Sequence, residues 1–340
     1  MTNSFMIPAI DILLPYRNAA TTLPACLESI ARQTINSWRL IAVDDGSTDA
    51  SASLLAHFSL SFPGTIRLSA GGAGLVAALN LGLRHATAPL VARMDADDTM
   101  MPSRLAAQAQ LLADQSGIGV ASCLVEEHGY AAGFTHYLQW SNQLVDPASI
   151  ATARFIESPI VHPTVCFRRE LIDLYGGYRD GDFPEDYELW LRWMDHGVSF
   201  AKVAEPLLHW TDHDHRLTRT DPRYRVEAFF DIKAHYLARW LKRYNPFGLH
   251  VWVWGAGYAT RRRVRRVCEH GIIIDRLIDI DPRKIGSTNQ DGPVVSPDAL
   301  PGPEHHFVLV AVGTRGAREL ITKFLEARGY RAGISYLCIA

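Results

Sequence analysis

The sequence has no long apolar run: none of its stretches approaches the roughly 20 residues needed to cross a bilayer. Its first segment, MTNSFMIPAIDILLPYRN, also lacks a basic stretch followed by a long apolar core, so it does not resemble a signal peptide. We therefore expect a cytoplasmic protein that is soluble or, at most, bound peripherally to the inner face of the plasma membrane.

Cysteine and net charge are both low. The 5 cysteines are scattered and never spaced as CxxC, which predicts reduced thiols rather than a disulfide framework. The net charge of −2 gives no sign of a nucleic-acid partner. Acidic residues outnumber basic ones in 1–245, which suits a metal site, whereas basic residues outnumber acidic ones in 246–340. The basic part could meet a membrane surface or a phosphorylated partner.

Strand and helix patterns alternate along the first 120 residues. The pattern of buried strands is found in four apolar runs, at 9–16, 38–45, 65–70 and 89–95. Between the first two runs, Leu23, Leu27 and Ile30 recur at helical spacing, so this segment predicts an amphipathic helix. The alternation predicts an α/β domain with a mostly parallel sheet, in which ligands gather at the carboxyl ends of the strands.

Three carboxylates in the stretch ARMDADDTMMP stand at such a strand end. Asp95 and Asp97 could bridge Mg²⁺ or Mn²⁺ to a diphosphate, because these cations take oxygen ligands and keep substrate phosphates in their shell. Asp98 could assist these ligands or cap the next helix. A solvated acidic turn remains the simpler alternative. A calcium EF-hand is excluded, because Met100 and Ala106 occupy the positions that such a loop gives to glycine and glutamate.

Four blocks of sequence resemble the family 2 glycosyltransferases, which have the GT-A fold. The blocks run in order over about residues 8–220 as LLPYRNAATTLPACLESIARQT, RLIAVDDGSTDAS, GGAGLVAALNLGLRHATAPLVARMDADD and HPTVCFRRELIDLYGGYRDGDFPEDYELWLR. The resemblance implies a mostly parallel central sheet flanked by helices, and a nucleotide-sugar as donor substrate.

The resemblance also implies roles on the donor side. Pro15 and Tyr16 match the segment that flanks the nucleotide base, and Asp44, or its neighbour Asp45, matches the acid that contacts base and ribose. Asp95 matches the acid of the DxD motif near the ribose.

The metal and its surroundings are implied in the same way. Asp97 matches the DxD residue on the metal, Mg²⁺ or Mn²⁺, which would neutralise the departing diphosphate. In HWTDHDHRLTR, His213 best matches a histidine that lies near the diphosphate or metal in the family. The arginine that usually follows the aromatic residue is missing, since Thr211 stands there, and a solvated loop is an equal alternative.

On the acceptor side, Asp186 in PEDYELW matches the catalytic base, and Gly177 and Tyr178 match the GGY segment. A carboxylate can accept the proton of an acceptor hydroxyl, and the start of a helix should keep Asp186 ionised. Glu185 is the nearest competitor for this role, and a purely structural acid in the first helical turn is the alternative. A base opposite the leaving group predicts inversion at the anomeric carbon.

A second βα pattern begins near residue 246 and predicts a small Rossmann-like domain over 246–340, after a glycosyltransferase domain over 1–245. It contains a strand, a Gly-x-Gly turn, an arginine-rich helix and a second strand that ends at Asp279 and Asp281. Thr260 replaces the third glycine, so both nucleotide binding and a packing or assembly role remain open. The stretch is similar to small Rossmann-like domains that precede some sugar acyltransferases and follow some glycosyltransferases and methyltransferases. Its arginines could face solvent, anionic lipid or a phosphorylated acceptor.

The combined expectation is an inverting, metal-dependent glycosyltransferase. It would move a sugar from a nucleotide-diphosphate sugar, with UDP favoured over GDP, to a hydroxyl of a glycan or lipid-linked acceptor in cell-surface polysaccharide synthesis. A catalytically inactive sugar-nucleotide-binding regulator is the alternative. A nucleotidyltransferase is disfavoured, because the segment LLPYRNAATTLP after the first strand contains no glycine for a phosphate loop. The sequence leaves the sugar, the acceptor and the oligomeric state open.

Overall fold

The computed structural model describes residues 9–126, 132–212, 216–314 and 316–340. The described chain divides into two compact units, which we describe separately. The first is drawn from residues 1–150, 159–180 and 196–220, and the second from residues 151–158, 181–195 and 221–340.

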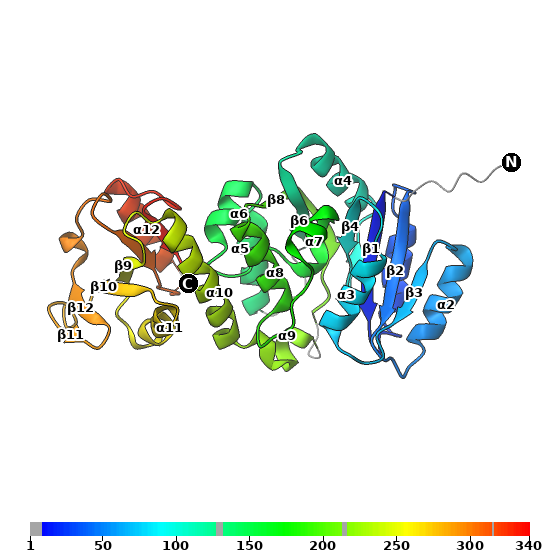
Figure 1. Cartoon of the computed structure of the whole chain (residues 1–340), viewed down its shortest axis with the longest axis horizontal. Helices are drawn as coiled ribbons and strands as arrows, with labels where there is room; N and C mark the ends of the chain where they lie inside the picture. The colour runs from blue at the N-terminus through cyan, green and yellow to red at the C-terminus, as the bar shows by residue number, and fades with distance from the viewer. Residues whose placement is uncertain (1–8, 127–131, 213–215, 315) are drawn as a thin grey trace. The chain divides into compact units, whose positions relative to one another are not determined.

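The first unit is built on a mixed sheet that has eight strands within the described residues, in the order β3-β2-β1-β4-β7-β6-β8-β5. The four strands predicted from the apolar runs are confirmed and pair in parallel: β1 (Ile10–Tyr16), β2 (Trp38–Asp44), β3 (Ile66–Ser69) and β4 (Leu90–Arg93). Figure 1 shows β1, β2 and β3 side by side. The remaining strands are β5 (Thr99–Met100), β6 (Ile118–Val125), β7 (Cys166–Arg168) and β8 (Ser199–His209). Strand β7 runs antiparallel to both of its neighbours.

Helices cover both faces of this sheet. The described helices of this unit are α1 (Leu23–Ala31), α2 (Ser51–Ser61), α3 (Leu75–His85), α4 (Arg104–Asp114), α5 (Ala132–Gln143), α7 (Glu170–Tyr175) and α9 (Leu217–Thr220), with the short η1 (His162–Thr164). Alternate residues of β1 face one core, where α1, α2 and α4 pack. Helix α3 lies on the opposite face, so close that a Cβ on Gly82 would come within 2.2 Å of the Leu13 side chain. The arrangement confirms the predicted α/β class.

A buried acid ties the parallel strands together. Asp11 of β1 is fully buried, and its carboxylate accepts hydrogen bonds from Arg39 of β2 at 2.7 and 2.9 Å. It also accepts the backbone N–H groups of Thr87 and Ala88, at 2.7 and 2.8 Å. Asp11 therefore joins β1 to β2 and to the segment that leads into β4.

Replacing Asp11 with alanine should lower the free energy of unfolding by about 3–5 kcal/mol, because Arg39, the buried Ala88 N–H and the partly buried Thr87 N–H would lose their acceptor. Urea denaturation followed by far-UV circular dichroism would measure the loss. Asp114→Ala, at an exposed acid of α4, is the matched control and should change stability by less than about 0.5 kcal/mol. Equal midpoints for the two variants would contradict the assignment.

The second unit contains a sheet in the order β11-β12-β10-β9-β13-β14, counted over its described residues. Its strands are β9 (His250–Trp254), β10 (Ile273–Ile278), β11 (Thr288–Asn289), β12 (Gly292–Val295), β13 (Phe307–Val310) and β14 (Tyr336–Cys338). All pairs except the β11–β12 hairpin are parallel. This second parallel α/β sheet is the one predicted after residue 246.

Helices flank this sheet too. They are α8 (Glu185–Asp195), α10 (Val226–Tyr244), α11 (Tyr258–Cys268) and α12 (Ala317–Ala327), with η2 (Pro222–Tyr224) and η3 (Pro297–Ala299). Helix α6 (Pro147–Ala153) begins in the first unit and ends in the second, because the chain divides after Ile150. Helices α8, α10 and α11 share one apolar cluster with the sheet, and α12 packs in a second cluster. Figure 1 shows α11 and α12 on different sides of β9 and β10. The predicted stretches 1–245 and 246–340 thus hold one sheet each, whereas α8 and α10 belong to the compact unit of the second sheet.

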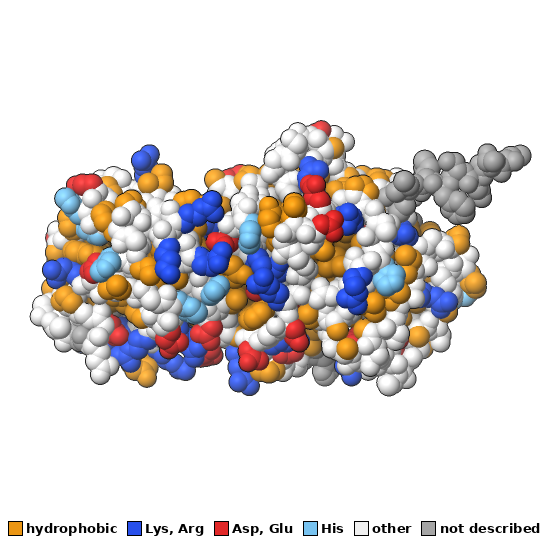
Figure 2. Space-filling view, in the orientation of Figure 1, with side chains coloured by type: hydrophobic (Ala, Val, Ile, Leu, Met, Phe, Trp, Pro, Cys, Tyr) orange, Lys and Arg blue, Asp and Glu red, His pale blue; other side chains and the backbone are white. Residues whose placement is uncertain are grey.

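The arginine-rich helix α11 is ion-paired within its own unit. Arg262, Arg265 and Arg266 lie 3.4, 2.9 and 2.6 Å from acidic oxygens of Glu227, Asp291 and Asp231. Figure 2 shows basic and acidic side chains next to one another around this helix. Of the roles that the sequence left open for these arginines, this pairing favours a helix face exposed to solvent over one that binds anionic lipid or a phosphorylated acceptor. Within the described residues, no helix has the length and apolar character that a membrane span requires.

Candidate active site

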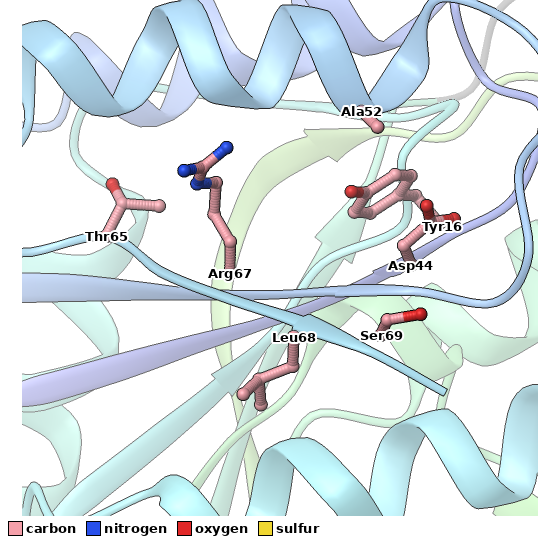
Figure 3. Close-up of a pocket in the computed structure, with 7 residues that line it drawn as sticks. All are labelled: Tyr16, Asp44, Ala52, Thr65, Arg67, Leu68 and Ser69. Carbon is pink, nitrogen blue, oxygen red and sulfur yellow. The ribbon is translucent and has the colours of Figure 1, made fainter. Parts of the chain in front are cut away.

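A pocket opens at the carboxyl ends of β1 and β2 and along β3. The parallel register sets Tyr16 beside Asp44, and Asp44 beside Ser69. The pocket has a volume of about 520 Å³ and is lined by Tyr16, Asp44, Ala52, Thr65, Arg67, Leu68 and Ser69. In Figure 3, the Tyr16 ring and the Arg67 guanidinium reach into the same space beneath the helix that carries Ala52. Burial, with Asp44 beside it, raises the pKa of Tyr16 to about 12, so its hydroxyl stays protonated.

The two neighbouring acids after β2 have different surroundings. Asp44 lines the pocket, and one of its oxygens accepts the Ser47 N–H at 2.8 Å. Asp45 is buried and accepts the Gly74 N–H at 2.9 Å, so it holds the start of α3. The structure therefore gives the pocket position to Asp44. Pro15 is buried within β1, outside the set of residues that line the pocket.

The three predicted carboxylates form one cluster after β4. Oxygens of Asp95, Asp97 and Asp98 all lie within 4.8 Å of one another. Asp98 is fully buried, and one of its oxygens accepts the Thr211 N–H at 2.9 Å. Its other oxygen, Oδ2, is buried without a hydrogen-bond partner in the described part of the chain. Burial, together with Asp95 and Asp97, raises the pKa of Asp98 well above its usual range.

This donor set fits a hard divalent cation. Such cations prefer carboxylate oxygens, and an unpartnered buried oxygen gains most from a positive partner. Asp98 therefore belongs with the candidate ligands, whereas the sequence left its role open.

Two positive side chains that the sequence did not single out lie against the cluster. Arg93 is almost fully buried, and its guanidinium donates to Asp95 at 2.5 Å. Burial alone would raise the pKa of Asp95, but Arg93, with Arg216 among the nearby cations, holds it below its usual range. Arg216 lies 4.0, 3.9 and 3.7 Å from oxygens of Asp95, Asp97 and Asp98. The predicted ligand His213 lies outside the described residues.

The predicted acceptor segment lies in the first unit. Through His162, it lies close to Arg93 and Asp95 of the carboxylate cluster. The Tyr178 hydroxyl is 2.7 Å from Nε2 of His162, whose pKa burial and Arg93 lower to about 3, so this ring is neutral. The Tyr178 backbone makes two hydrogen bonds to Asn80 of α3, at 2.8 and 3.0 Å. A Cβ on Gly177 would lie 2.6 Å from the Asn80 amide oxygen, so a larger residue there would have to displace this amide from its bonds to Tyr178.

The predicted base belongs to the second unit. Asp186 is the second residue of α8 and half-buried, and one of its oxygens accepts the Tyr187 N–H at 2.7 Å. Its competitor Glu185 is buried, and both of its carboxylate oxygens accept the Tyr224 hydroxyl, at 2.7 and 2.8 Å. Glu185 thus has a structural partner, and Asp186 is the more exposed of the two.

Comparison with known proteins identifies the class that this fold and cluster define. Residues 11–175 match the family Glycosyl transferase family 2. The chain is 32% identical over 204 residues to the amylovoran biosynthesis glycosyltransferase AmsE of Erwinia amylovora, covering 59% of this chain and 74% of that protein. It is also 29% identical to an Escherichia coli UDP-Gal:alpha-D-GlcNAc-diphosphoundecaprenol beta-1,3-galactosyltransferase, covering 48% of this chain and 58% of that one. The chain belongs to the family 2 glycosyltransferases and is a transferase enzyme.

Solved structures show the same fold. A fragment of Staphylococcus aureus TarS in complex with UDP-GlcNAc aligns with a TM-score of 0.56 at 14% identity, over 77% of this chain and 71% of that one. A Pyrobaculum calidifontis mannosyltransferase in complex with GDP-Man and Mn²⁺ aligns with a TM-score of 0.51 at 19% identity, over 70% and 64%. These likenesses support the GT-A fold predicted from the sequence.

Proposed function

We propose that this chain moves a sugar from a nucleotide-diphosphate sugar to a hydroxyl of a glycan or lipid-linked acceptor in cell-surface polysaccharide synthesis. The observation that carries the proposal is the three-carboxylate cluster after β4, on the sheet whose neighbouring strand ends form the pocket. The relatives named for amylovoran biosynthesis and for a diphosphoundecaprenol acceptor support the pathway and the acceptor class. Such an acceptor would place the enzyme in the cytoplasm, at the inner membrane surface.

The pocket would bind the nucleotide base, and its polar groups match uracil. Asp44 can accept the ring N–H of uracil, while the exposed Arg67 can donate to a flanking carbonyl oxygen. The Tyr16 ring offers a face for stacking. Guanine also has an N–H beside a carbonyl, and complexes of this fold contain UDP-GlcNAc in one case and GDP-Man in another. We favour UDP, because one acid and one guanidinium suffice for the smaller base.

Replacing Arg67 with alanine should weaken nucleotide binding by about 10-fold, because one charged hydrogen bond to the base is lost. A thermal-shift series with UDP, GDP and dTDP, each with Mn²⁺, would measure the change, since a ligand raises apparent stability by mass action. Arg84→Ala removes another exposed arginine, from α3, and should leave the shifts unchanged. Unaltered UDP binding in Arg67→Ala would contradict the proposed base site.

Each group then has a defined part in the transfer. Asp97 and Asp98 would hold Mg²⁺ or Mn²⁺, and Asp95, fixed by Arg93, would face the ribose. The bound ion would neutralise charge on the departing diphosphate. Asp186 would take the proton of the acceptor hydroxyl as the oxygen attacks the anomeric carbon, and attack opposite the leaving group inverts that carbon.

The experiment that tests this function is an NMR time course of UDP-sugars with the protein and Mn²⁺. An intact transferase site should release UDP slowly by hydrolysis even without an acceptor, and faster once an acceptor is supplied. The configuration of the product reports inversion or retention. Binding without any turnover, with every donor and a lipid-diphosphate acceptor, would instead indicate an inactive sugar-nucleotide-binding protein.

A further inference from the structure

We propose that His162 contacts the sugar of the donor substrate and that Tyr178 and Asn80 position it there, so that these residues select the sugar without binding the nucleotide. This inference rests on the proposed function, because it concerns the sugar that would be transferred at the carboxylate cluster. It adds a binding residue that the predicted site did not contain, and it makes Tyr178 a positioning residue rather than a direct acceptor contact.

Tyr178 is held at both of its ends and is itself almost enclosed. It is only 5% exposed, and its hydroxyl lies 2.7 Å from Nε2 of His162. The Asn80 side chain holds its backbone, because the amide nitrogen donates to the Tyr178 carbonyl at 2.8 Å and the amide oxygen accepts the Tyr178 N–H at 3.0 Å. His162 is the more exposed member of the pair. A substrate at this place would therefore meet His162 rather than Tyr178.

The helix that carries Asn80 is fixed against the strands of the candidate base pocket. Gly74, directly before α3, donates its N–H at 2.9 Å to Asp45, which directly follows β2. Further along α3, Gly82 lies so close to β1 that a Cβ there would come within 2.2 Å of a β1 side chain. Asn80 lies between these two points of the chain. It therefore sets the position of Tyr178 relative to the strands whose ends line the pocket.

His162 also lies beside the carboxylate cluster. It belongs to η1, which packs against β4, and the Arg93 N–H at the end of β4 donates to the Val165 carbonyl just after η1, at 2.9 Å. Burial and then Arg93 lower the pKa of His162 to about 3, although Asp95 opposes them, so its imidazole is neutral. A neutral imidazole can form a hydrogen bond with a sugar hydroxyl without adding charge beside the metal site.

The sugar is the part of the substrates that fits this position. During transfer it must lie between the diphosphate, which the cluster would bind, and the acceptor hydroxyl that attacks it. His162 is close to Asp95 of the cluster and is hydrogen-bonded to Tyr178 of the predicted acceptor segment. Sugars that differ in the orientation of one hydroxyl would bind differently here, because a hydroxyl that misses its partner leaves polar groups of the site unpaired.

The test compares the affinities for UDP, UDP-glucose, UDP-galactose and UDP-GlcNAc by isothermal titration calorimetry, each with Mn²⁺. In His162→Ala, the affinity for the UDP-sugar that the natural protein binds most tightly should fall about 10-fold, while the affinity for UDP stays within about 2-fold. Tyr178→Phe removes only the hydroxyl, and Asn80→Ala removes both backbone contacts. Each should lower the same UDP-sugar affinity about 3-fold with unchanged UDP binding, and they provide further variants if His162→Ala does not fold.

The matched control is Tyr330→Phe. Tyr330 makes the same kind of contact, 2.9 Å from Nε2 of His306 in the second unit, so its loss should leave all four affinities unchanged. Equal losses for UDP and UDP-sugars in His162→Ala, or no loss at all, would overturn the sugar contact and leave the proposed function intact. Unchanged affinities in both Tyr178→Phe and Asn80→Ala would overturn the positioning roles. If the natural protein bound neither UDP nor any UDP-sugar, the proposed donor site would fail, and this inference with it.

Discussion

Asparagine in place of Asp97 is expected to slow sugar transfer by about 100- to 1,000-fold, because one charged ligand of the metal site is lost while the side chain keeps its shape. Asp97 is partly exposed at the cluster, so the asparagine side chain can still form hydrogen bonds with water. We therefore expect the thermal stability of the fold to be unchanged and the whole effect to appear in the rate of sugar transfer.

Initial rates at increasing Mn²⁺ concentration, beside thermal melting of each protein, would measure this effect. Asp98→Asn is a second test of the same site. The buried Oδ2 of Asp98 would become a metal ligand in the metal-bound state, so this variant should have both a lower transfer rate and a lower metal affinity. Asp114→Asn changes an exposed acid of α4 and should leave the rate unaltered. An Asp97 variant with full activity at saturating Mn²⁺ would remove Asp97 from the metal site.

The parallel part of the first sheet was predictable because its inner strands, β1, β2 and β4, are largely buried on both sides. Such strands are apolar over most of their length, as IDILLPY of β1 is apart from Asp11, and each ends where polar residues of the candidate site begin. Strand β7 was not predicted, because three residues carry no periodic signal and its place depends on pairing with β4 and β6. The sequence also could not show that α8 and α10 pack with the second sheet.

The site was predictable where a role depends on residue type and spacing, and not where it depends on tertiary contact. Tyr16 is the last residue of β1, and the DxD carboxylates come a few residues after the end of β4. Arg216, however, reaches the cluster from more than 100 residues away along the chain, as the Asp98–Thr211 separation of 113 shows. Its sequence signal was weak: an arginine six residues after Trp210, where the family pattern suggested one immediately after the aromatic residue. Which of Asp44 and Asp45 lines the pocket likewise could not be read from the sequence.

Asparagine in place of Asp186 is expected to lower kcat by about 100- to 10,000-fold with unchanged donor affinity, the pattern of a lost general base. The amide oxygen of the substituted side chain could still accept the Tyr187 N–H, so the first turn of α8 should be preserved. Calorimetric titration with UDP and Mn²⁺ would confirm donor binding, and single-turnover assays with acceptor would isolate the chemical step.

Two neighbouring acids make this test specific. Asp182→Asn changes an exposed acid just before α8 and should leave kcat unaltered. Glu185→Gln replaces a buried carboxylate that accepts the Tyr224 hydroxyl, so it should lower stability more than it lowers kcat. Retained turnover in Asp186→Asn would exclude it as the base. If Glu185→Gln then lost turnover while melting normally, the role would pass to Glu185, and its contact with Tyr224 would be what orients the base.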